Sequence, residues 1–170
     1  MATGDIFVQT SSVTVTNTTT ETTVIGTGIG QTTVASGFIY LATTMRFLVL
    51  GHMSTAAAVP GTFRVRIKIG SVTIADTGAQ TLPANVTNGQ LFLVAFCTCR
   101  TNGASGTVFS QGRITIPASV LTDANWPMVN TATSTIDTTA SQTFDITVEY
   151  GTANASNTVT ITNLHIRKEA

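Results

Sequence analysis

The sequence predicts an all-β protein, a single-domain antiparallel β-sandwich with jelly-roll-like topology and about nine or ten strands. Threonine, which favours strands, makes up roughly a fifth of the chain. Short segments alternate between polar and apolar residues, turn-forming residues recur about every eight to fifteen positions, and no amphipathic helix is indicated. A length of 170 residues fits one domain covering residues 1–170, with residues 1–11 as a candidate extended N-terminal arm.

The N-terminal third contains both alternating and continuous apolar segments. Residues 12–16 alternate, the polar residues 17–21 interrupt, and residues 23–25 resume a strand pattern. Residues 38–41 and 45–53 are apolar at nearly every position, which is typical of strands covered on both faces. We therefore expect both of these apolar segments in the middle of a sheet.

A hairpin is predicted in the middle of the chain. Residues 63–69 alternate strictly, Gly70 ends the run, and residues 72–74 form the returning strand. One face of the first strand is apolar. The other face carries Arg64, Arg66 and Lys68, a basic ribbon about 14 Å long at strand spacing.

The C-terminal half supplies the remaining strands. Residues 91–100 are apolar on both faces, and the glycine-rich link 102–106 leads into a further strand. Residues 117–124 are the one segment expected to form a helical turn. Residues 143–150 and 158–166 close the sheet. This strand count favours a jelly roll over an immunoglobulin-like sandwich, whose Cys…Trp…Cys framework is missing.

The charge balance limits the partners. Eight basic and eight acidic residues cancel, so no field gathers nucleic acid or an anionic membrane surface. No segment approaches the roughly 20 apolar residues that span a bilayer, and the N-terminus does not resemble a secretory signal, so synthesis in a cytoplasm is expected. With only 9% charged residues, the chain is expected to cover part of its surface by forming a homo-oligomer, a trimer.

Neither a metal nor another cofactor is expected. Cys97 and Cys99 are the two cysteines, and two residues apart on a strand they lie about 7 Å from each other, too far for a disulfide. A zinc site would need further ligands, and the histidines are His52 and His165. We interpret the cysteines as small buried apolar side chains.

The sequence also indicates that the protein is not an enzyme. No serine lies in a GxSxG elbow, and the Gly-rich residues 26–31 lack the register and the lysine of a phosphate loop. Asp145 and Glu149 share a strand face but lie about 13 Å apart, whereas glycosidase carboxylates need about 5 to 9.5 Å.

The basic ribbon Arg64, Arg66 and Lys68 has three interpretations. It forms a solvated face that resists edge-to-edge aggregation, or it pairs with Asp145 and Glu149 on a neighbouring strand or subunit, or it docks on an acidic surface. The second and third interpretations make it an inter-subunit or docking surface.

Several segments together resemble the small virion structural proteins of tailed bacteriophages. They are Thr-Thr-Thr-Glu-Thr-Thr-Val-Ile-Gly at 18–26, Arg-Ile-Lys-Ile-Gly at 66–70, and the threonine-rich strands 136–151 and 157–166. The resemblance extends over nearly the whole chain. It implies a virion location and a capsid decoration, head-fibre or tail-fibre-tip protein, often a trimeric jelly roll, and it carries over no catalytic residue.

Two roles follow from this resemblance. The first is a decoration or cement protein that covers the outer surface of the major capsid protein. The second is a receptor-binding module of a tail fibre or spike that binds a cell-surface glycan, with Trp126 as its candidate contact. Trp126 in an Asn-Trp-Pro loop could equally plug the end of the sandwich. Strand-like sequence begins within about a dozen residues of Met1, which favours decoration.

Overall fold

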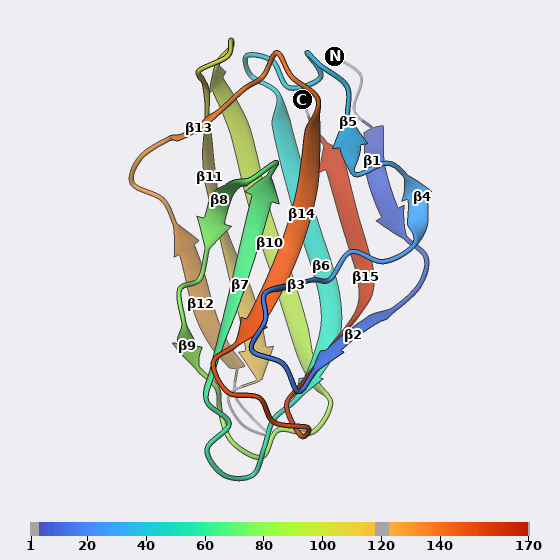
Figure 1. The fold of residues 1–170 in the computed structure, drawn as a ribbon, viewed down its shortest axis with the longest axis vertical. Coiled ribbons are helices and arrows are strands. Elements are labelled where there is room, and N and C mark those ends of the chain that lie inside the picture. The colour runs from blue at the N-terminus through green and yellow to red at the C-terminus, as the bar shows by residue number, and fades with distance from the viewer. Residues whose placement is uncertain (1–3, 118–122, 170) are drawn as a thin grey trace.

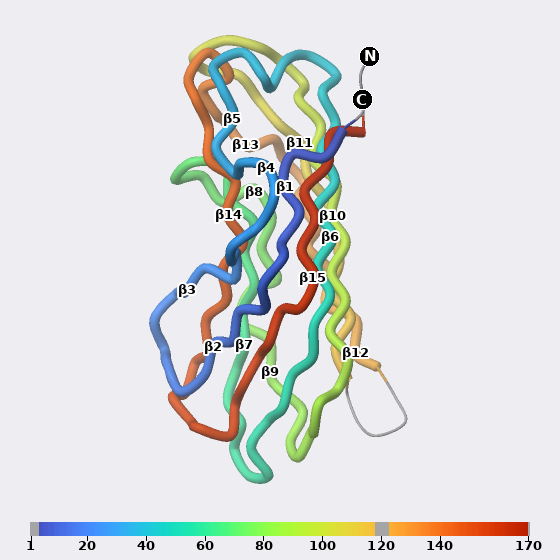
Figure 2. The backbone as a smooth tube through the Cα atoms, turned by 90° about the vertical axis from the view of Figure 1, so that its right-hand side faces the viewer, coloured from blue at the N-terminus to red at the C-terminus, as the bar shows by residue number. Residues whose placement is uncertain are grey.

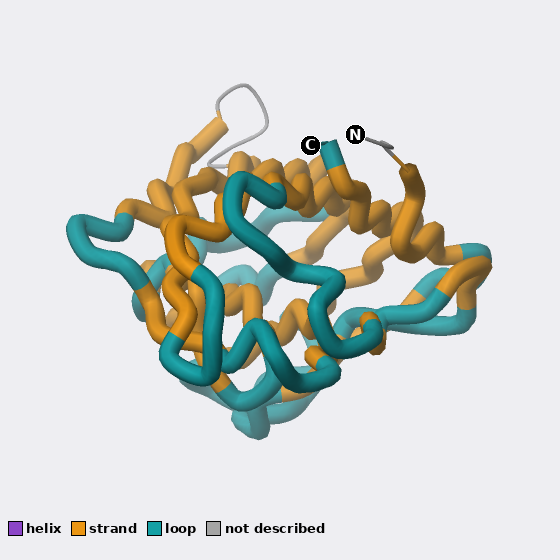
Figure 3. The backbone as a smooth tube through the Cα atoms, turned by 90° about the horizontal axis from the view of Figure 1, so that it is seen from above, coloured by secondary structure: helices purple, strands orange, loops and turns teal. Residues whose placement is uncertain are grey.

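The computed structural model describes residues 4–117 and 123–169, and in this part the chain is a β-sandwich of two antiparallel sheets (Figure 1). Figure 2 shows the sheets edge-on as two layers. Figure 3, seen along the long axis, shows connecting loops gathered over one end of the sandwich. The described residues contain no helix, so the predicted all-β class and the sandwich are confirmed.

The larger sheet has nine strands among the described residues. They are β1 (Gly4–Gln9), β2 (Val13–Thr16), β4 (Gly28–Gly30), β6 (Thr44–Ser54), β10 (Gly89–Thr101), β11 (Gly106–Pro117), β12 (Asp123–Val129), β13 (Ser134–Ile136) and β15 (Thr158–Lys168). The strand order is β12-β11-β10-β6-β15-β1-β4, with β13 paired to β11 and β2 paired to β15.

The smaller sheet has six strands in the same part of the chain. They are β3 (Thr22–Thr23), β5 (Thr33–Val34), β7 (Thr62–Ile69), β8 (Val72–Asp76), β9 (Gln80–Thr81) and β14 (Gln142–Tyr150). The strand order is β3-β14-β7-β8, with β5 paired to β14 and β9 paired to β7. The predicted hairpin is therefore β7–β8, and Gly70 between its strands has a φ of 58°.

A two-stranded ribbon passes from one sheet to the other. In the larger sheet β6 pairs with β15, and in the smaller sheet their chain neighbours β7 and β14 pair. Both strands of the ribbon change sheets at one end of the molecule. Jelly rolls are built from such ribbons, but here the β7–β8 and β10–β11 hairpins each stay within one sheet, and a jelly-roll topology is not confirmed.

The core lies between the sheets and is filled by alternate residues of their strands. In β7 the residues Phe63, Val65, Ile67 and Ile69 are buried, and every second residue from Thr62 is partly exposed. In strand β14 the inward residues Phe144, Ile146, Val148 and Tyr150 are buried in the same way, and Thr147 on the outer face is buried as well. Aromatic rings cross the middle of the sandwich. Phe47 of the larger sheet meets Phe144 of the smaller edge-on at 5.8 Å, and Phe63 lies 4.9 Å from Tyr150.

Two predictions for the N-terminal part are wrong. Residues 38–41 form no strand: they lie in the loop between β5 and β6, because positive φ angles of 73° at Gly37 and 70° at Ala42 turn the chain on either side. Residues 4–9 are not an arm but the strand β1, hydrogen-bonded between β15 and β4. The apolar pair Ile6 and Phe7 explains this, because both side chains are buried in the core.

The expected helical turn at 117–124 falls largely on residues 118–122, which lie outside the described residues. Its ends belong to strands, since Pro117 is the last residue of β11 and Asp123 the first of β12.

The sequence predicted that β6 and β10 are buried on both faces, and this prediction is also wrong. Their inward side chains are buried, from Met45 to Met53 except at the partly exposed Gly51, and from Leu91 to Cys99. Their outward residues are only partly covered, and Phe96 is 47% exposed. The second apolar face of these strands is therefore uncovered within a single chain.

Asn157 is expected to be a stabilising residue of the loops at the end where the ribbon changes sheets. It is fully buried, its Oδ1 accepts a hydrogen bond from the Ala56 N–H (2.9 Å), and its Nδ2 donates to the Pro60 carbonyl (2.7 Å). We expect Asn157→Ala to lower the free energy of unfolding by about 2–4 kcal/mol, because two buried backbone groups lose their partners.

Urea denaturation at a fixed protein concentration measures this change. The exposed Asn102 provides the control, and Asn102→Ala should change stability by less than about 0.5 kcal/mol. Equal stability of the two variants would show that the Asn157 bonds do not stabilise the loops.

Candidate functional site

The basic ribbon lies on the outer face of the smaller sheet, where β7 directs Arg64, Arg66 and Lys68 away from the core. Strand β14 pairs with β7 in a register that places Asp145 beside Lys68 and Glu149 beside Arg64. The alternation of both strands produces this arrangement, since residues of one strand face lie opposite those of the next. The predicted charged residues are thus brought together within one chain.

Three carboxylates neutralise the ribbon. Arg66 Nη1 lies 2.9 Å from Glu21 Oε2 and 2.7 Å from Glu149 Oε2. Arg64 Nε lies 2.9 and 3.1 Å from the two carboxylate oxygens of Asp76. Arg66 has the least exposed charged side chain of the group, 13%, and touches all three carboxylates, with Asp76 at 3.7 Å.

Lys68 and Asp145 do not pair, although they are neighbours in the register. Lys68 Nζ instead donates to Glu21 Oε1 at 2.7 Å, and Asp145 accepts a 2.6 Å hydrogen bond from the Thr23 hydroxyl. The second interpretation of the ribbon is therefore observed for Glu149 and is wrong for Asp145. The reason is strand β3, which lies on the far side of β14 and brings Glu21 and Thr23 over this face.

Glu21 and Asp76 were missed by the sequence analysis. Asp76 lies opposite Arg66 in the β7–β8 register, so extending the predicted hairpin by two residues would have found it. Glu21 had no local signal, because it lies 47 residues from Lys68 and in the polar turn between two predicted strands.

The network favours the ionised form of Glu21 and Asp76. The hydrogen bonds from Lys68 and Thr147, with the charge of Arg66, lower the pKa of Glu21 against the opposing effect of burial. For Asp76 burial is the largest single effect and favours the neutral acid. The hydrogen bonds from Arg64 and the Gly78 N–H outweigh it together with the nearby charges, and the pKa of Asp76 is lowered. Asp76 in turn raises the pKa of Arg64.

The cysteines are structural. Cys97 and Cys99 point into the core from β10 and are free thiols. Burial raises the pKa of Cys97 to about 12, so its reactive thiolate form is not populated near neutral pH. The described residues contain no group of three or more His, Cys, Asp or Glu side chains able to hold a metal ion.

Trp126 is not a loop residue. It lies in β12, opposite Ile114 of β11, and its side chain is 7% exposed. Its ring packs in the core, 6.4 Å from the ring of Phe63. Strand alternation turns Trp126 inward, so the proposed glycan contact lacks the exposed ring face that stacking on a sugar requires.

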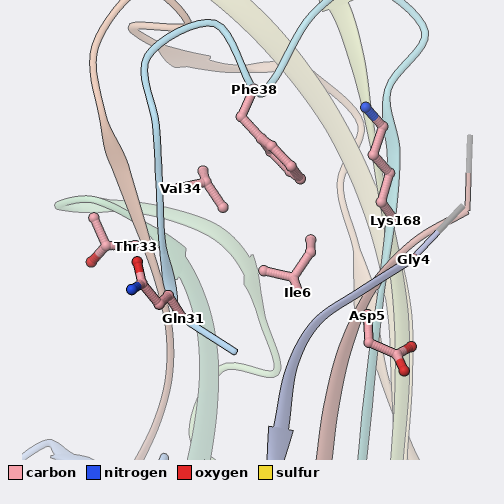
Figure 4. Close-up of a pocket in the computed structure, with 8 residues that line it drawn as sticks. All are labelled: Gly4, Asp5, Ile6, Gln31, Thr33, Val34, Phe38 and Lys168. Carbon is pink, nitrogen blue, oxygen red and sulfur yellow. The ribbon is translucent and has the colours of Figure 1, made fainter. Parts of the chain in front are cut away.

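A hollow of about 440 Å³ lies at the edge of the sandwich where β1 and β5 approach (Figure 4). Ile6, Val34 and Phe38 form its apolar wall. Its charged groups already have partners. Lys168 Nζ lies over the ring of Tyr40 at 4.1 Å, and Asp5 Oδ1 lies 2.7 Å from His165 Nε2. The hollow therefore indicates no particular ligand chemistry.

The opposite side of the molecule, the outward side of the larger sheet, carries many apolar residues together with polar ones such as Arg46, Arg113 and His165. Its outward apolar residues, here called the outer apolar face, are Val8, Ile29, Leu48, Leu50, Phe92, Val94, Phe96, Phe109 and Val129. Three of them are well exposed, Phe96 at 47%, Val129 at 64% and Ile29 at 73%. Figure 2 shows no described element packed against the outward side of β6, β10 and β15.

Comparison of the chain with protein-family models, with curated proteins and with solved structures finds no significant match. Within residues 4–117 and 123–169, no helix has the length and apolar character needed to cross a bilayer.

Arg66 should contribute most to the ion-pair network. Arg66→Met keeps most of the apolar stem but leaves Glu21 and Glu149 without a shared cation. We expect it to lower the free energy of unfolding by about 2 kcal/mol, between the values typical of exposed and of buried ion pairs. Arg64→Met is the matched control, because Arg64 is 37% exposed and contacts one carboxylate, and its cost should stay below about 1 kcal/mol. Chemical denaturation at pH 7 compares them, and an equal or larger loss for Arg64→Met would contradict this ranking.

The lowered pKa values of Glu21 and Asp76 predict a loss of stability in acid. The folded protein binds these protons less readily than the unfolded chain, so the stabilisation is fully present above the ordinary carboxylate range near pH 4. It disappears as the pH falls through the lowered values. Glu21→Gln should therefore be less stable than wild type at pH 6, with the difference shrinking below pH 4. Thermal unfolding between pH 3 and pH 7 measures this, and a difference that stays constant over this range would exclude Glu21 as a source of the pH dependence.

Proposed function

We propose that this protein is a non-enzymatic structural subunit of a bacteriophage virion, an oligomeric decoration protein bound to the outer surface of the capsid. The observation that carries the proposal is the outer apolar face. A protein that functions as a separate monomer rarely exposes a contiguous apolar sheet face, whereas a subunit of an assembly buries such a face against its neighbours.

The two outer faces suit different surroundings. The smaller sheet carries the ion-pair network, whose three cations are matched by Glu21, Asp76 and Glu149, and such a neutral, hydrated surface suits contact with solvent. The larger sheet carries the apolar residues, so it is the side that a neighbouring subunit or the major capsid protein would cover. The sequence resembles small phage virion proteins, and this resemblance is the basis for proposing a phage virion as the particle and a trimer as the oligomer.

The alternative is a tail-fibre or spike module that binds a glycan, and its candidate contact residue was Trp126. Trp126 is buried in the core, and sugar recognition by stacked aromatic rings needs exposed rings beside polar groups. On the outer apolar face Phe96 is exposed, and Phe92 and Phe109 are partly exposed, but the face lies on a broad sheet, a shape that suits contact with another protein.

Cryo-electron imaging of virions from the source lysate, labelled with an antibody to this chain, tests the proposal. We expect label distributed over the capsid. Label confined to the tail tip would replace decoration by the fibre role, and unlabelled virions would contradict both. A virion preparation treated with an antibody to an unrelated protein controls for non-specific label.

A further inference from the structure

We infer that the outer apolar face is a self-association surface, on which a second copy of this chain packs face to face. The inference rests on the proposed role as an assembling subunit and names the partner of that surface. It is carried by the size of the face, by a hollow that can receive an aromatic side chain, and by the apolar centre and polar border of the face.

The face has the size that a stable pairing needs. Strands β11, β10, β6 and β15 are adjacent, and β6 is 11 residues long. At about 3.4 Å per residue and 4.8 Å between strands, they present a surface of about 36 by 19 Å, or about 700 Å² before side-chain relief is counted. A standard protein interface buries about 800 Å² per partner, so two such faces match a stable interface.

The apolar residues form a continuous stripe at the centre of this surface. The register places Phe92 beside Leu50 and Val94 beside Leu48 on adjacent strands, and Phe96 extends the stripe along β10. Polar residues border it on both sides, including Arg113 of β11 and His165 of β15. An apolar centre with a polar border is the usual composition of a protein interface.

A hollow of about 170 Å³ lies beside the stripe. It is lined by Val8, Gln9, Leu48, Leu50, Asn163, Leu164 and His165. The shift in strand register between Ile161 and Asn163 of β15 lies next to it. The face therefore carries projecting aromatic residues on one side of β6 and a depression on the other.

When two copies face each other, the projecting aromatic residues of each copy lie over the depression of the other. Strands β10 and β15 are the two neighbours of β6, so a two-fold axis along β6 sets β10 of one copy over β15 of the other. Phe92, Leu50 and Asn163 share one row across these strands, which brings Phe92 of one copy to the hollow of its partner. By the same symmetry Phe96 meets Arg167, where a guanidinium can stack on the ring.

The same axis determines which polar residues meet. It overlays β11 on β1, and the shared rows place Gln111 of one copy opposite Asp5 of the other. Arg46 of β6 lies on the axis, where its guanidinium is already paired with Glu169 at 2.9 Å. The chain as a whole carries no net charge, so two copies do not repel each other at long range. Two-fold pairing gives a dimer, or joins two of the proposed trimers into a hexamer.

Sedimentation equilibrium of the purified full chain at micromolar concentration tests the inference. The wild type should have the mass of an even number of chains, and Phe96→Lys should halve that mass, because two lysines replace two rings near the arginines of the border. The matched control is Val59→Lys in the β6–β7 loop, where an 82% exposed apolar residue receives the same charge away from the face. This control should keep the wild-type mass.

A near-ultraviolet circular dichroism spectrum like that of wild type establishes that the Phe96→Lys variant is folded. If it does not fold, Val94→Lys and Val129→Lys on the same face replace it in the comparison. A monomeric or purely trimeric wild type, or variants of the face that keep the wild-type mass, would overturn the inference. Antibody labelling of virions does not depend on this result. The proposed self-association and the proposed virion location can therefore be contradicted independently of each other.

Discussion

Each long strand of this protein hides one face and presents the other, because consecutive side chains point to opposite sides. The inner faces of the two sheets bury each other, with Phe47 of β6 against Phe144 of β14 at the centre. The whole molecule depends on this burial, since the described residues contain no disulfide, helix or metal cluster that could replace it. The same alternation creates two outer faces, and the side chains on each face determine whether solvent or another protein can cover it.

The two outer faces differ in the polarity of their side chains and in the contacts that these side chains make. On the smaller sheet, Arg66 joins Glu21, Asp76 and Glu149 into one network, so the face is charged, locally neutral and stable in water. On the larger sheet, leucine, valine and phenylalanine occupy the centre of the outward side, polar residues such as Arg46 and Arg113 lie beside them, and no described element covers them. This asymmetry explains how a chain with few charges combines a solvent-facing side with a side suited to assembly.

Threonine supplies polarity where charge is scarce. Hydroxyl groups pair across neighbouring strands at 2.8 to 3.0 Å, in Thr14–Thr160, Thr33–Thr143, Thr44–Thr98 and Thr101–Thr107. Such pairs satisfy polar groups on a sheet surface without an ionic partner, and the β-branched side chain favours the strand itself. The high threonine content therefore contributes to the stability of the sheets. In the loops, the buried Asn157 likewise satisfies polar groups without a charge, by hydrogen bonds to two backbone groups.

The sequence by itself determined the fold class, most of the long strands, and which side chains share a face, including the ribbon Arg64, Arg66 and Lys68. Each of these is a local property of alternation and turn residues. Only the tertiary structure decided that Glu21 completes the network, that Trp126 lies in the core, and that the second apolar face of β10 is uncovered. These depend on which strands become neighbours, and strand neighbours here are joined by hydrogen bonds between residues as far apart as Asp5 and His165, 160 positions along the chain. Local patterns carry no information on such pairings, because they are selected by the burial of the whole core.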